Sequence, residues 1–81
     1  MLCPEILNLE VIEKYKLKVV YKTGEIRLFD AADHLWGPVF EPLKNEEYFK
    51  LVFISFNTVE WPNGADFAPE FLYEQSVPVD E

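Results

Sequence analysis

Cysteine, glycine and histidine are scarce in this chain, and each scarcity argues against a class of function. Cys3 is the only cysteine, so no intramolecular disulfide can form, and a small domain without a disulfide framework is typical of the reducing cytoplasm. Three glycines do not make a glycine-rich phosphate loop, and no serine stands in a G-x-S-x-G turn. No apolar run approaches the roughly 18 residues of a membrane helix, and no basic-then-apolar leader opens the chain. The sequence predicts a soluble, cytoplasmic protein.

Basic residues are outnumbered by acidic ones. Seven lysines and arginines stand against fifteen aspartates and glutamates, which gives a net charge of −8. This field repels phosphate backbones and anionic lipid, so we expect no nucleic-acid binding by this chain alone and no membrane binding. The same field would speed encounter with a small basic protein partner, although acidity is also a common route to solubility.

The apolar content is sufficient for one core. Hydrophobic residues make up 49% of the 81 residues, and 16% of the chain is aromatic. A chain of this length cannot divide its buried surface between two cores, so residues 1–81 are expected to form a single domain. We expect it to fold without metal, disulfide or cofactor.

Apolar and polar residues alternate over much of the first thirty positions, which is typical of strands with one buried face. We expect strands at residues 6–11, 16–22 and 25–30, the last two joined by a turn in which Gly24 adopts a positive φ. In the first strand, one face should carry Leu7, Leu9 and Val11, and in the second strand one face should carry Leu17, Val19 and Tyr21. In the third strand, Ile26 and Leu28 should lie on one face, and Arg27 and Phe29 on the other. The lysines and Arg27 are expected on the solvent face.

Short helices are predicted in the middle of the chain. Residues 31–36 should form one or two helical turns, capped by Asp30 and stopped by a glycine and a proline. Residues 39–43 are flanked by two prolines and are expected to be irregular. Asn45 should cap a further turn that carries two glutamates near its start and delivers two aromatic residues to the core.

A second hairpin and a last helix complete the expected fold. Residues 51–56 are continuously apolar or β-prone, which predicts a strand covered on both faces, followed by a turn into a strand at 59–61. Residues 62–66 form a loop, 69–73 form a short helix begun by a proline, and the tail 75–81 is expected to be loose. The fold class is α+β: a small curved antiparallel sheet of about five strands, a meander plus a hairpin, with two or three short helices.

The loop that follows the second hairpin is the most distinctive segment. A binding interpretation has the loop present its backbone, Asn63, Gly64 and Asp66, beside Trp61, to a ligand or partner. The alternative is structural, with Trp61 as a core residue and Asn63-Gly64 as an ordinary turn.

Catalytic and metal-binding candidates are weak. His34 is the only histidine, and no Cys/His spacing supports a zinc site. Acid–base chemistry by His34 with Asp33 or Asp66 is one candidate, and the enzymatic alternative combines the Trp61 loop with Asp66, Glu60 and His34. Cys3 has no neighbouring base or cation to favour its thiolate. We expect no catalytic residues and no bound metal.

A set of residues spread over the chain resembles the bacterial domain of unknown function 2442. Its pattern V-x-F-x-D-G, a later D, L-R-D-x-x-x-F and W-P-N-G-x-D-x-x-P-x-x-L-Y corresponds here to Val19, Tyr21, Thr23-Gly24 and Asp30, then Leu43-Lys44-Asn45 with Phe49, and finally Trp61-Pro62-Asn63-Gly64, Asp66, Pro69 and Leu72-Tyr73. Thr23 and Asn45 replace aspartates of the pattern, which preserves turn and cap chemistry but removes two charges.

The resemblance implies a small α+β domain with a curved antiparallel sheet and short helices. Longer relatives carry a C-terminal helix-turn-helix, which is not expected here, and small relatives resemble members of toxin–antitoxin-like two-gene cassettes. The leading hypothesis is therefore a protein-interaction or assembly module, with an antitoxin-like partner in a two-gene cassette as its specific form. The alternative is a ligand-binding or enzymatic domain that uses the loop 61–66. A homodimer is also predicted, because dimerisation adds buried apolar area that so short a chain lacks.

Overall fold

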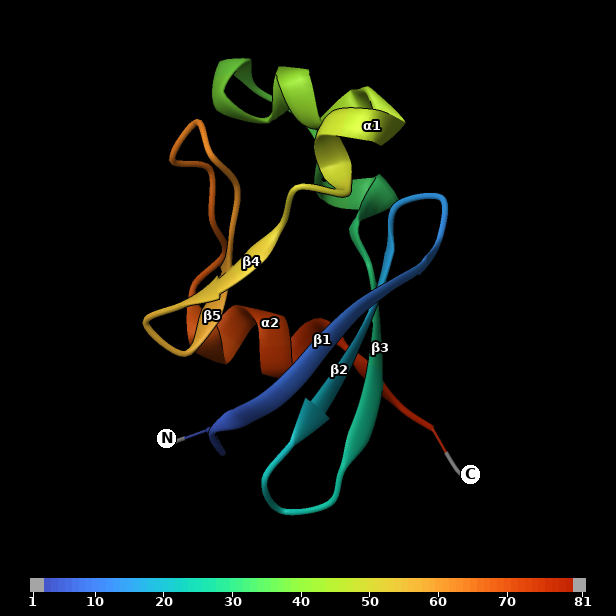
Figure 1. The fold of residues 1–81 in the computed structure, drawn as a ribbon, viewed down its shortest axis with the longest axis vertical. Coiled ribbons are helices and arrows are strands. Elements are labelled where there is room, and N and C mark those ends of the chain that lie inside the picture. Colours follow the sequence, from blue (N-terminus) through green and yellow to red (C-terminus); the bar gives the residue numbers. More distant parts are fainter. Residues whose placement is uncertain (1–2, 80–81) are drawn as a thin grey trace.

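The computed structural model describes residues 3–79 and contains two antiparallel sheets (Figure 1). The first is a four-stranded sheet in the order β1-β2-β3-β6, formed by β1 (Ile6–Glu13), β2 (Lys16–Tyr21), β3 (Ile26–Asp30) and β6 (Val77–Pro78). The second is the two-stranded hairpin of β4 (Phe53–Ser55) and β5 (Thr58–Glu60). This arrangement confirms the predicted α+β class, with the second hairpin forming a sheet of its own.

Within residues 3–79, four short helices connect and cover the sheets. They are η1 (Ala31–His34), η2 (Pro38–Lys44), α1 (Glu46–Phe49) and α2 (Pro69–Gln75), of which η1 and η2 are 3₁₀ helices. The predicted caps are confirmed: the Asp30 carboxylate accepts from the Ala32 amide, and the Asn45 side-chain oxygen accepts from the amides of Glu47 and Tyr48 in α1. Each cap satisfies amides that the helix itself leaves unpaired.

The irregular path expected for residues 39–43 is wrong. The segment forms η2, in which the Phe40 amide donates to Gly37 and the Asn45 amide donates to Pro42. Proline fixes a φ that the first turn of a helix accepts, and 3₁₀ bonds span only three residues, so two prolines are compatible with a short 3₁₀ run. Leu43 is fully buried and fastens the helix to the core.

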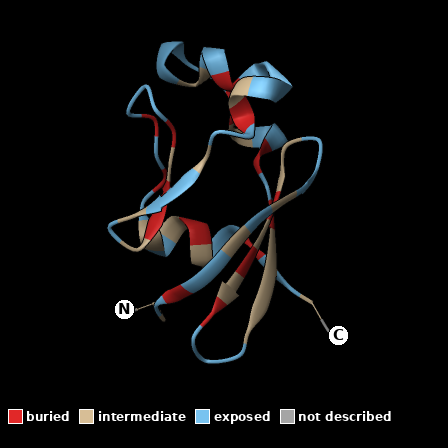
Figure 2. Cartoon of the chain, viewed as in Figure 1, coloured by how far each residue is buried: buried red, intermediate tan, exposed pale blue. Residues whose placement is uncertain are grey.

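The core lies between the inner face of the large sheet, the hairpin and α2 (Figure 2), and it is rich in aromatic rings. Its largest fully buried side chains are Trp61, Tyr21, Phe29, Phe49, Leu17, Leu43, Leu72, Val19 and Val59. The predicted face of the second strand is confirmed, since all three of its inward residues are buried.

Leu7 departs from the predicted first-strand pattern. The register passes from Ile6 opposite Tyr21 to Asn8 opposite Val20, so Leu7 is the extra residue of a β-bulge. A bulge reverses which face the following residues present. Ile6 therefore enters the core, and Leu7 is exposed.

Arg27 does not lie on the solvent face with the lysines, as the sequence suggested. The register pairs Arg27 with Val19 and Phe29 with Leu17, which places both β3 residues on the inner face. The Arg27 guanidinium lies 4.2 Å from the Tyr73 ring centroid. A buried charge needs such partners, and they come from a segment far along the chain that local patterning cannot reveal.

The same guanidinium organises the tail. Its Nε donates to the Ser76 hydroxyl at 2.7 Å and its Nη2 donates to the Ser76 carbonyl at 2.9 Å. The segment 75–81 was predicted to be loose, and within it Val77–Pro78 pairs with β3 as β6. Residues 80 and 81 lie outside the described part of the chain.

The second hairpin has the predicted connectivity but not the predicted environment. Its turn is formed by Phe56 and Asn57, both with positive φ. Asn57 ties the hairpin to the first strand, because its side-chain oxygen accepts from the Ile6 amide at 2.8 Å. The expectation of a strand covered on both faces is wrong: Phe53 and Ile54 are each more than 40% exposed. Two-residue turns of this type bring strands close together, but the described residues leave these two side chains of β4 largely uncovered.

Candidate functional site: an aromatic groove

Trp61 lies inside the protein. Its side chain is completely buried, and the indole Nε1 donates to the Phe49 carbonyl at 2.8 Å. Its backbone closes the following loop, since the Trp61 amide donates to Ala65 and its carbonyl accepts from Gly64, both at 2.9 Å. Gly64 has a φ of +89°, which a side chain would strain.

Asn63 uses its side-chain amide within the chain. Its Nδ2 donates to the Val39 carbonyl at 2.8 Å, and its Oδ1 accepts from the Ala65 amide at 3.1 Å. The first bond fastens the loop to η2, and the second stabilises the turn. Both the Nδ2 and the Oδ1 atom of Asn63 are thus hydrogen-bonded within the protein, although the residue is exposed.

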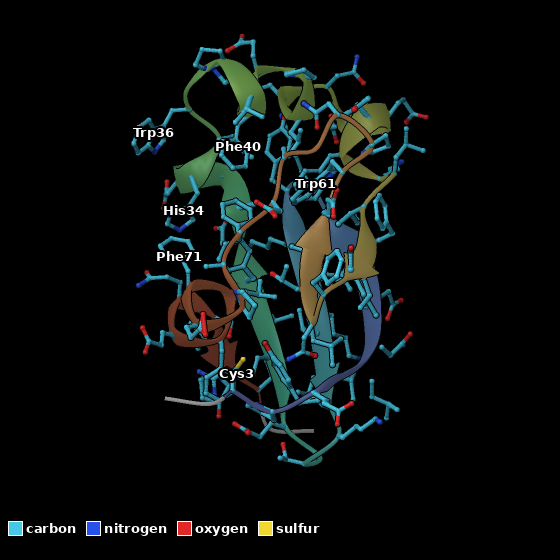
Figure 3. All side chains as sticks on the ribbon, turned by 90° about the vertical axis from the view of Figure 1, so that its left-hand side faces the viewer. Cys3, His34, Trp36, Phe40, Trp61 and Phe71 are labelled. Carbon is cyan, nitrogen blue, oxygen red and sulfur yellow. The ribbon has the colours of Figure 1, made fainter. Side chains whose placement is uncertain are left out.

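A surface depression adjoins this loop and is called here the aromatic groove. It encloses about 350 Å³ and is lined by His34, Trp36, Phe40, Asp66, Phe67, Ala68 and Phe71. These residues come from η1, η2, the segment after the loop and α2, which places side chains far apart in sequence on one surface. Figure 3 shows His34, Trp36, Phe40 and Phe71 gathered along one side of the molecule, with Trp61 set apart from them in the interior.

Stacked rings form the wall of the groove. Phe67, nearly buried, stacks on Phe40 with centroids 5.1 Å apart and on Phe71 at 5.7 Å. The His34 imidazole stacks on Phe29 at 5.4 Å and meets Phe71 edge-on at 5.1 Å. Offset and edge-to-face contacts of this kind fix ring orientations, so this wall is preformed.

Trp36 differs from the wall residues because 74% of it is exposed. It follows the C-cap residue of η1, Leu35, and precedes Gly37, whose φ of +93° turns the chain sharply toward η2. An indole left in water at the edge of an apolar depression is available for contact with another molecule.

Two of the residues singled out from the sequence line the groove, namely Asp66 and His34. Trp61, Asn63 and Gly64 lie in or beneath the loop instead, and Glu60 meets Asp66 through a backbone bridge. Sequence reasoning missed Trp36, Phe40 and Phe71. The only sequence signal for Trp36 was a large aromatic residue at a helix end, outside any periodic apolar pattern.

The ionisable side chains of the groove lining are one carboxylate and one imidazole, with no lysine or arginine among them. Within residues 3–79, no group of three or more His, Cys, Asp or Glu side chains is arranged to bind a metal. Cys3 accepts a hydrogen bond from the Asn57 side-chain amide at 3.8 Å and lies well away from His34 (Figure 3). The groove therefore offers apolar contact and one negative charge.

The perturbed ionisable groups lie outside the groove. The Tyr73 hydroxyl donates to both oxygens of Glu25, at 2.7 and 2.8 Å. This bond lowers the pKa of the Glu25 carboxyl and raises the pKa of the Tyr73 hydroxyl. Burial, aided by the nearby Cys3, raises the pKa of Tyr21 to about 12. Arg27 pairs with the same carboxylate at 3.1 Å, so this network joins β3 to α2.

No helix among the described residues is long and apolar enough to cross a membrane. Comparison with curated proteins and with solved structures gives no match. One family model matches residues 6–78, which spans both sheets and all four helices. The chain accordingly belongs to the family described as Protein of unknown function (DUF2442).

Proposed function

We propose that this domain is a cytoplasmic protein-interaction module whose aromatic groove binds a partner segment carrying a bulky apolar side chain next to a lysine or arginine. The observation that carries the proposal is the exposed Trp36 beside the preformed aromatic wall. Tryptophan is among the residues most enriched at the energetic centres of protein interfaces.

The aromatic rings that form the wall of the groove are held in place before any partner binds, which favours binding. Phe40 and Phe71 are already held by Phe67, so an incoming side chain would order only Trp36 and itself. Side-chain ordering costs about 0.5–1.5 kcal/mol per flexible group, and a preformed site avoids most of it.

Charge selects the kind of partner. The net charge of −8 accelerates approach of a cation and repels an acidic surface. At the groove, the Asp66 carboxylate is exposed and has no basic neighbour in the lining. A partner lysine or arginine next to the apolar anchor would complete this pairing. The cassettes of the resembling proteins make a small basic protein encoded by the neighbouring gene the first candidate, with this chain as its antitoxin-like companion.

The test is titration of this domain with the purified product of the neighbouring gene. The two tryptophans report separately, because Trp36 is exposed and Trp61 is buried. Binding in the groove should protect Trp36 from iodide quenching and shift its emission to the blue. Trp36→Ala should weaken binding about thirtyfold, the ~2 kcal/mol expected of an interface hot spot.

A matched control uses another exposed ring. Phe56→Ala removes a ring that is 94% exposed on the hairpin turn and should leave affinity for the partner within about twofold. Asp66→Asn should weaken binding and reduce its salt dependence, because one screened charge pair is lost. Equal affinity of the parent and Trp36→Ala, or no complex at micromolar concentrations, would exclude this function.

A small-molecule site in the same groove is the second candidate. It is favoured by the presence of an imidazole and a carboxylate, His34 and Asp66, in one lining. The groove volume is at the lower end of the roughly 300–1,000 Å³ of ligand sites. A broad thermal-shift screen decides the matter: a compound that stabilises the parent but not Asp66→Ala would support it. Asn63→Ala distinguishes a structural role from a binding role. It removes the hydrogen bond to the Val39 carbonyl, so it should lower the melting temperature whether or not the compound is present.

A further inference from the structure

The hairpin of β4 and β5 exposes apolar side chains in a stretch without charge. Leu51, Phe53, Ile54 and Phe56 are all classed as exposed, and Figure 2 shows β4 at the surface. Residues 51–59 contain no Asp, Glu, Lys or Arg, in a chain of which 27% is charged. We infer that this apolar hairpin, residues 51–59, is a self-association surface that pairs with the same hairpin of a second copy.

Within residues 3–79, the edge of β4 away from β5 is not paired with another strand, although β1 runs close to β4. In the β4–β5 register, Ile54 stands opposite Val59 next to the turn-flanking pair Ser55 and Thr58. In a two-residue hairpin the turn-flanking pair is hydrogen-bonded and the next pair is not, so the Ile54 amide and carbonyl point away from β5. Within residues 3–79, β4 pairs with no other strand. A second β4, running antiparallel, would satisfy these groups.

The two edge strands of the large sheet carry features that block pairing, and β4 does not. β1 is interrupted by two bulges, at Leu7 and Ile12, and carries Glu10 and Glu13. β6 consists of two residues and ends in Pro78, which has no amide hydrogen. Bulges, charges and prolines are the usual protections of an edge strand. Their absence at β4 makes it the one of these three edges that accepts another strand.

Phe56 supplies a separate indication. It adopts a φ of +48° at the first turn position, where asparagine or glycine is favoured, and its ring is 94% exposed. A bulky residue in this conformation is strained and gains no burial within the chain to compensate. In a two-fold dimer built on β4, the ring lies at the end of the shared edge, where the partner's hairpin can cover it.

Electrostatics identifies the occupant as a second copy. Two chains of charge −8 repel each other over most of their surfaces. The apolar hairpin is uncharged, so contact there places no carboxylates opposite each other. A basic partner gains nothing from this surface, because it offers no anion. The pairing is isologous, so it closes at the dimer.

The expected dimer is weak. Phe56 offers roughly 150–200 Å² and the other three side chains offer less, which places the interface at or below the small end of the range, under about 1,200 Å² in total. A dissociation constant of roughly 1–100 µM is expected, and it should fall on raising NaCl from about 50 to about 500 mM, because salt screens the repulsion between copies.

Sedimentation velocity over roughly 5–500 µM protein tests the inference, a range chosen to bracket the expected dissociation constant. Phe56→Asn should weaken the dimer at least tenfold without lowering the melting temperature, because asparagine suits the turn position. Ile54→Lys should abolish the dimer by charging the edge. Trp36→Ala removes an exposed ring outside the hairpin and should leave the dimer unchanged. A parent that stays monomeric throughout, or a dimer lost in Trp36→Ala and kept in Phe56→Asn, would overturn it.

Discussion

Tyr21→Phe should stabilise the protein, because it removes a buried hydroxyl without a partner. The Tyr21 ring is 1% exposed and meets the Tyr73 ring edge-on at 5.2 Å, so phenylalanine fills the same space. Among the described residues, the Tyr21 hydroxyl makes no hydrogen bond. An unsatisfied buried polar group costs about 1–3 kcal/mol, and we expect a gain of about 1–2 kcal/mol at neutral pH. The melting temperature should rise by roughly 4–8 °C per kcal/mol.

The same substitution should flatten the alkaline side of the stability curve. Burial raises the pKa of Tyr21 from 10.0 to about 12. Above pH 10 the unfolded state releases this proton while the folded state retains it, so folding loses stability as pH rises toward 12. After allowance for solvent screening the loss is roughly 1–2 kcal/mol, and it should be absent in Tyr21→Phe.

Urea denaturation measures both the gain in stability at pH 7 and the alkaline loss of stability. The alkaline series runs from pH 9 to 11.5, a range of about two and a half units around the ordinary tyrosine pKa. The control is Tyr15→Phe, the same chemical change where the hydroxyl donates to the Lys44 carbonyl. That variant should lose about 0.5–1.5 kcal/mol. Destabilisation by Tyr21→Phe at pH 7 would mean that its hydroxyl has a partner and would refute the reasoning.

Two further substitutions, with one control, test the interior and the β3–α2 network. Trp61→Phe removes the indole donor to the Phe49 carbonyl and leaves a cavity, so it should cost about 2–4 kcal/mol in urea denaturation. Trp36→Phe, at the exposed indole, should change stability by less than about 0.5 kcal/mol. Glu25→Gln should reduce acid sensitivity: the Tyr73 hydroxyl lowers the pKa of Glu25, so its contribution is present above pH 4.5 and is lost as pH falls below it. Equal acid midpoints for Glu25→Gln and the parent would contradict this assignment.

Local chemistry in the sequence predicted the elements whose partners are close by. The Asn45 cap, the turn at Gly24 and the inward face of β2 all depend on neighbours within a few residues, and all are confirmed. Arg27 was misplaced because its partner Ser76 is 49 positions away. The sequence does not distinguish a charged residue that pairs inside the protein from one that is exposed to solvent.

The candidate site was only partly predictable for the same reason. Asp66 and His34 attracted attention by residue type, but the groove exists because η1, η2 and α2 converge on Phe67. A single sequence carries no signal for that convergence. The apolar run 51–56 was likewise ambiguous, because continuous hydrophobicity describes both a doubly covered strand and an exposed adhesive edge.

The acidic charge makes the exposed apolar surfaces compatible with a discrete assembly. Trp36 and Phe56 would ordinarily invite indiscriminate aggregation, since both rings are largely in water. Repulsion between copies of charge −8 opposes every approach that brings carboxylates together, and it is weakest where residues 51–59 meet their own copy. A basic partner experiences the opposite force and is drawn toward the Asp66 side of the groove. If both proposals hold, one charge distribution separates the two surfaces by occupant, with a second copy at the uncharged hairpin and a basic partner at the aromatic groove.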